Sequence, residues 1–174
     1  MKQYLIPILL GILVLASGLV VGCGQKQSTA ELEAYLNEAS PIMQRHVETT
    51  ETTNRANRAF LGAVSSGDEA EVIKTLVIYV DTLEWALNRV DSELLDFKKL
   101  IPPPEARTFH SLMIDGLMKE QAALGDTLAY YSSVLLYGFG DDKALDNANT
   151  LMFEASNIWL QAQYELQDLM QKLE

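Results

Sequence analysis

The two histidines, His46 and His110, are the natural candidates for metal binding in this chain. Helical bundles that hold two iron or manganese ions use Glu-x-x-His pairs, whereas Met43 and Arg107 stand three residues before these histidines. No His-Glu-x-x-His sequence occurs either. If the helix ends are aligned, about 10 Å along the axis separates the two histidines, which is too far for one ion. We therefore expect no metal and no cofactor, and a structural role for each histidine.

Polar residues occupy part of the inward-facing register of the first predicted helix. These residues are His46, Thr50, Thr53 and Asn57. With aligned helix ends, Thr50, Gln121 and Asn157 fall at a similar height, and we hypothesise that they form a polar layer that binds a small polar ligand. The first alternative is a hydrogen-bonded layer that only fixes the register of the helices. The second alternative rotates the first helix, so that other side chains take these positions: Val47, Asn54 and Leu61.

In the predicted bundle, aromatic residues gather at the end opposite the start of the first helix. The candidate partner-binding patch comprises Phe60, Tyr131, Tyr137 and Phe139. The alternative is that these rings close the end of the bundle, with the tyrosine hydroxyls reaching water.

Sequence patterns of catalytic sites are missing from the chain. It contains no Gly-x-Ser-x-Gly elbow and no Gly-x-x-x-x-Gly-Lys phosphate-binding loop, and its single cysteine, Cys23, lies outside the predicted domain. Acidic residues are abundant, but most fall on the outward faces of the predicted helices. We therefore expect a protein that is not an enzyme and has no catalytic residues.

The N-terminus has the layout of a cleavable export signal. A short basic start precedes the apolar run Tyr4–Leu19, and small residues lead to Gly22 and Cys23. An uncleaved membrane-spanning helix is the alternative, although Pro7 and the glycines of this segment weaken it. Residues 1–22 are therefore predicted to be removed, residues 23–29 to form a short tether, and residues 30–174 to form one folded domain.

The residues around Cys23 resemble the lipobox of bacterial lipoproteins, with Gly22 before the cysteine and aliphatic residues further back. The resemblance implies cleavage before Cys23 and attachment of lipid to its thiol. It places the protein in the cell membrane or the outer membrane, with the domain outside the cytoplasm. Val20, where leucine is commonest, is a mild departure from the family pattern.

Four long helical patterns follow the tether. A capping box at Ser28 and Glu31 predicts the start of the first helix, with Pro41 inside it and Gly67 as its end. The second helix, about 68–101, alternates apolar spacings of three and four, which predicts a packing seam. The predicted seam comprises Ile73, Leu76, Val80, Leu83, Leu87, Val90, Leu94, Phe97 and Ile101. The third runs from about Pro104 to Tyr137, and the fourth begins after Asp141 or Asp142. Short turns between such helices predict an all-α, up-down-up-down antiparallel four-helix bundle about 50 Å long.

The negative net charge of the chain argues against binding to nucleic acid or to an anionic membrane surface. The formal net charge is −11, or −12 without residues 1–22, in which Lys2 is the only charged side chain. Nucleic-acid binding requires clustered cations, so none is expected. Membrane contact is expected through the lipid anchor rather than through a basic face.

The run Leu100–Glu105, with three prolines and with His110 further on, is similar to a pattern in uncharacterised secreted bacterial helical proteins. The resemblance implies extracytoplasmic helical hairpins and no particular activity. The function expected first is a lipid-anchored, non-enzymatic binding or scaffold module of the cell envelope, with an envelope protein as its partner. The alternatives are a ligand-sensing bundle, similar in architecture to the periplasmic domains of chemoreceptors, and a metal protein or enzyme.

Overall fold

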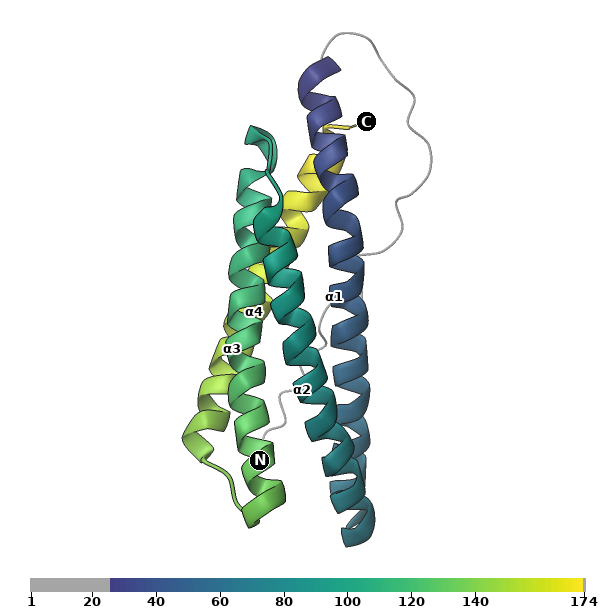
Figure 1. Ribbon diagram of the computed structural model, residues 1–174, viewed down its shortest axis with the longest axis vertical. Helices are drawn as coiled ribbons and strands as arrows, with labels where there is room; N and C mark the ends of the chain where they lie inside the picture. Colours follow the sequence, from purple (N-terminus) through teal and green to yellow (C-terminus); the bar gives the residue numbers. More distant parts are fainter. Residues whose placement is uncertain (1–25, 174) are drawn as a thin grey trace.

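The computed structural model describes residues 26–173, which form four long helices connected by short turns (Figure 1). The start of the first helix, the turn between the second and third helices, and the C-terminal end lie together at one end of the bundle. The other two turns lie at the opposite end, which we call the distal end. The predicted up-down-up-down bundle is confirmed. Its elements are α1 (Lys26–Ser66), α2 (Glu69–Lys99), the 3-10 turn η1 (Pro104–Ala106), α3 (Arg107–Tyr137) and α4 (Asp142–Gln171).

Helix ends fall where local chemistry stops a helix. Gly67 and Gly138 follow α1 and α3 with φ angles of 73° and 80°, a left-handed conformation that glycine adopts without a Cβ clash. Asp68 caps α2 by accepting hydrogen bonds from the backbone N–H groups of residues 70 and 71, and Asp141 caps α4 through Lys143 N–H. The three prolines end α2 as predicted, because proline cannot continue the hydrogen-bond pattern.

The first helix differs from expectation at its start. It begins at Lys26, two residues before Ser28. Helix termini commonly shift by one or two residues relative to local signals. The helix also continues through Pro41 to Ser66 without interruption. Because Pro41 is exposed, the carbonyl that its missing N–H leaves unpaired can face water. Residues 1–25, including Cys23 and the predicted signal, lie outside the described part of the chain.

The apolar seam of α2 is confirmed in its central part. Its buried members are Leu76, Leu83, Val90, Leu94 and Phe97. The prediction is wrong at both ends, where Ile73 is 60% exposed and Ile101 is 89% exposed. Ile101 lies in the proline turn beyond α2. Ile73 is exposed although Thr75, Leu76 and Tyr79 are buried, so the buried face of α2 points away from Ile73.

Helix packing is uneven around the bundle. α1 packs closely against α2, α2 against α3, and α3 against α4, whereas α1 and α4 approach each other much less. On α3, buried residues occur from Phe109 to Leu124 but not in the distal segment 125–137. The tightest core of α3 therefore lies in the middle of the bundle and toward the end opposite the distal turns. Between residues 26 and 173, no helix combines the length and apolar character that crossing a bilayer requires.

Candidate functional site

A histidine between two glutamates lies at the centre of the bundle. His46 of α1 is within hydrogen-bonding distance of Glu93 of α2, with 3.0 Å between Nδ1 and Oε2. Its other ring nitrogen, Nε2, lies 3.3 Å from Oε2 of Glu120 on α3. Both glutamates are buried, with exposed fractions of 1% and 6%. The three side chains therefore connect three helices through charged groups inside the core.

Two further side chains complete this buried cluster. Thr49 of α1 donates its hydroxyl to Oε1 of Glu93 at 3.0 Å. Trp159 of α4 donates its indole N–H to Oε2 of Glu120 at 3.2 Å, and its ring lies 4.7 Å from the ring of His46. All four helices thus contribute to one hydrogen-bonded set, which we call the His46 cluster.

Gly116 explains how Trp159 reaches α3. A Cβ atom at this position would lie 3.0 Å from the indole ring, closer than side chains normally pack. The glycine therefore lets the large ring lie directly against the α3 backbone. Glu120 lies one helical turn further along α3, so the indole N–H and the carboxylate meet.

The glutamates determine the charge of His46. Burial by itself lowers the pKa of the imidazole, but the charges and hydrogen bonds of Glu120 and Glu93 outweigh burial and raise it to about 10. A doubly protonated ring hydrogen-bonds to Glu93 through Nδ1 and forms an ion pair with Glu120 through Nε2. The cluster is therefore an imidazolium held between two carboxylates.

The raised pKa of His46 makes the free energy of unfolding depend on pH in the alkaline range. The pKa of His46 is raised in the folded state above its unfolded value of about 6.5, so the stabilisation is complete below that pH and is lost as pH rises toward 10. We expect the free energy of unfolding to fall in this window by at most about 1.4 kcal/mol per pH unit. Urea unfolding at pH 6, 8 and 9.5 measures it. The His46→Gln variant is the control, and equal slopes for both proteins would contradict the assignment.

The chemistry open to the His46 cluster is limited by its own bonding. Both imidazole nitrogens face carboxylates, so neither lone pair is available for a metal ion or for accepting a proton from a substrate. Within residues 26–173, no three His, Cys, Asp or Glu side chains are grouped so that they could hold a metal ion. The arrangement favours a role in fixing the rotation and register of the helices.

The predicted polar layer of Thr50, Gln121 and Asn157 does not form. Asn157 is exposed, Thr50 is half-buried, and Gln121 donates a hydrogen bond to Asp91 near the surface. His46 alone among the predicted polar-core residues joins the buried cluster. Two other members of the cluster are sequence neighbours of predicted residues: Thr49 is buried instead of Thr50, and Glu120 instead of Gln121. One residue corresponds to about 100° of helix rotation, so a one-residue error moves a side chain from the core-facing side of the helix to its flank.

Glu93 and Glu120 are the functional residues that sequence reasoning missed, because acidic residues were assigned to outward faces. A signal for Glu120 exists in the spacing of its neighbours. Met113, Leu117 and Leu124 are buried, and Glu120 fills the position between them that the three-and-four spacing reserves for a core residue. A charged residue in such a position indicates a buried partner of opposite charge.

His110 lies in a separate environment from His46, as expected from their different heights. Its Nδ1 is 3.1 Å from the hydroxyl oxygen of Tyr35, and its ring lies near those of Phe97 and Tyr35. Burial lowers the pKa of His110. A neutral, hydrogen-bonded histidine in an aromatic environment has a structural role.

The predicted distal aromatic patch divides into two parts. Phe60 is buried and packs against Tyr79 and the half-buried Tyr131, so these rings close the end of the core. The patch prediction is wrong for this inner part, because neighbouring helices cover it. Tyr137 and Phe139, in contrast, are 69% and 71% exposed in the turn between α3 and α4.

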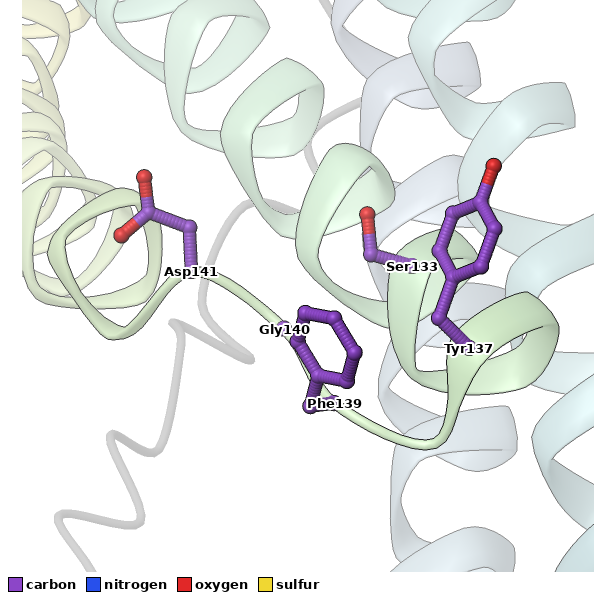
Figure 2. A pocket seen from close by; sticks show the side chains of 5 residues that line it. All are labelled: Ser133, Tyr137, Phe139, Gly140 and Asp141. Carbon is purple, nitrogen blue, oxygen red and sulfur yellow. The ribbon is translucent and has the colours of Figure 1, made fainter.

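A hollow of about 410 Å³ lies at this turn (Figure 2). The rings of Tyr137 and Phe139 and the side chains of Ser133 and Asp141 line it. Gly140 lies so close to the Tyr130 ring that a Cβ atom would collide with it, which brings the turn against α3. A second hollow lies at the proline turn beside Tyr35 and Ile101. Neither hollow is lined by residues of the His46 cluster.

Comparisons of the chain with protein-family models, with curated proteins and with solved structures found no match.

Proposed function

We propose that the protein is a lipid-anchored, non-enzymatic binding or scaffold module of the bacterial cell envelope, with its domain outside the cytoplasm. The observation that carries the binding role is the exposed α3–α4 turn. Leu136, Tyr137 and Phe139 are each about 70% exposed there, next to the hollow. Large apolar side chains gathered on a surface indicate an interaction site.

The direction of the bundle supports the same role. Lys26, where α1 begins, is three residues from Cys23, a distance of about 10 Å for an extended chain. A lipid on Cys23 therefore holds the start of α1 close to the bilayer. The α3–α4 turn lies at the other end of the bundle (Figure 1), where it is accessible to a partner in the envelope.

The interior of the bundle gives less support to the other two functions. A ligand-sensing bundle was expected to use Thr50, Gln121 and Asn157, but these side chains do not converge. An enzyme would need a free acid, base or nucleophile, whereas His46 is bonded at both nitrogens. The binding or scaffold function therefore rests on the surface and not on the core.

Lipid attachment is tested by Cys23→Ser, which removes the only thiol in the chain. We expect no incorporation of labelled fatty acid and accumulation of a larger, uncleaved precursor, because lipid transfer precedes cleavage in this family. Gel mobility and label incorporation measure both effects. Gln25→Ala is the matched control and should be processed normally. Normal processing of Cys23→Ser would overturn the lipoprotein part of the proposal.

The binding role is tested by photo-crosslinking in intact cells. A photoreactive amino acid at position 136 should yield discrete adducts, because Leu136 is 71% exposed and directly precedes Tyr137, which lines the hollow. The matched control is the same amino acid at position 101, since Ile101 is equally apolar, even more exposed and at the opposite end. Adding Phe139→Ala should remove the adducts from position 136. Identical adducts from both positions, or adducts insensitive to Phe139→Ala, would contradict the binding role of this turn.

A further inference from the structure

The hollow at the α3–α4 turn is lined by groups that attract positive charge. The rings of Tyr137 and Phe139 lie with centroids 6.3 Å apart and planes tilted by 39°, and aromatic faces bind cations. The Ser133 hydroxyl donates its hydrogen to the Ala129 carbonyl, which leaves the oxygen as an acceptor. Asp141 also lines the hollow, on the opposite side of Phe139 from Tyr137 (Figure 2).

Asp141 has acceptor capacity left for a ligand. Its Oδ1 accepts the Lys143 backbone N–H at 3.0 Å and thereby caps α4. Its Oδ2 takes part in no hydrogen bond within residues 26–173, and the residue is exposed. One oxygen thus holds the helix start while the other can accept a hydrogen bond from a bound cation.

Charge differs between the distal turns and the proline turn. The distal turns, residues 65–70 and 136–146, carry five carboxylates and one lysine. The proline turn, residues 98–107, carries three cationic side chains and one carboxylate. A basic partner is therefore attracted to the distal end, where the hollow lies, and not to the proline turn.

We propose that this hollow receives a lysine or arginine side chain from a basic segment of a partner protein, which packs on the Tyr137 and Phe139 rings while the negative charge of Asp141 at the edge of the hollow attracts it. The proposal rests on the binding function proposed above and names the chemistry of the partner. The exposed side chain of Leu136, at the end of the same helix, offers apolar area for the rest of the segment.

The test uses the full-length lipidated protein in detergent micelles, with hexa-arginine as the probe. Hexacitrulline, which has a neutral group in place of each guanidinium, is the matched control peptide. We expect hexa-arginine to shift the NMR signals of the Tyr137 ring in a saturable way that sodium chloride weakens. We expect hexacitrulline to leave these signals unchanged. Equal shifts from both peptides would overturn the proposal.

Three variants separate a built site from general attraction to an acidic protein. Asp141→Asn keeps the helix cap, since asparagine caps as well as aspartate, but removes the charge. Phe139→Leu keeps apolar area and removes a ring. Each should weaken hexa-arginine binding about 2- to 5-fold, the size of an exposed cation–π or ion-pair contact. Glu105→Gln removes one charge at the proline turn and should leave the affinity unchanged.

Each remaining outcome overturns the proposal. Equal weakening by Glu105→Gln and Asp141→Asn would mean non-specific attraction. Tyr137 shifts that follow protein concentration without peptide would mean that a second copy of the chain occupies the hollow. If position 136 still forms Phe139-dependent adducts in cells while hexa-arginine does not bind, the binding function stands and the cationic partner does not.

Discussion

Replacing His46 by leucine should lower the free energy of unfolding by about 3–5 kcal/mol, because two buried carboxylates lose the cation between them. Glu93 is 1% exposed and Glu120 is 6% exposed, so water cannot take the place of the imidazolium. Urea or thermal unfolding followed by circular dichroism measures the loss. His110→Leu is the matched control, since it removes a half-buried histidine with one hydrogen bond and should cost about 1 kcal/mol.

A second set of changes tests the cause of that loss. Adding Glu93→Gln and Glu120→Gln to His46→Leu removes the unpaired charges and should restore part of the stability, since neutral replacements of buried ion pairs are often tolerated. If His46→Leu melts like the parent protein, the buried ion pairs do not stabilise the fold. If the two glutamines restore nothing, lost packing rather than unpaired charge explains the effect.

Leu83→Asp should loosen or unfold the bundle. Leu83 is 1% exposed in the central seam of α2, and burying an unpaired carboxylate there costs several kcal/mol, on the order of the whole stability of a domain this size. We expect loss of the cooperative melting transition. Val77→Asp on the same helix is the matched control, because Val77 is 39% exposed and surface changes usually cost less than about 0.5 kcal/mol. Equal melting of both variants would mean that the seam is not buried.

The sequence by itself determined the helices, their ends and their antiparallel order. Each of these depends on neighbouring residues. Gly67 adopts a left-handed conformation after α1, three prolines stop α2, and Asp141 caps α4. Long helices joined by short turns must then reverse direction, which leaves an up-down-up-down bundle as the economical arrangement. The central seam of α2 followed from the same local periodicity.

Only the tertiary structure decided which polar side chains face inward. Thr49 and Glu120 are inside, while Thr50 and Gln121 lie closer to the surface, although each pair is adjacent in the sequence. About 100° of rotation separates adjacent helix residues, and spacing alone does not fix rotation that finely. Glu120 is stable in the core because His46 and Trp159 reach it from two other helices. The tertiary structure also decided which distal aromatic rings are exposed, because neighbouring helices cover Phe60 and leave Phe139 exposed in its turn.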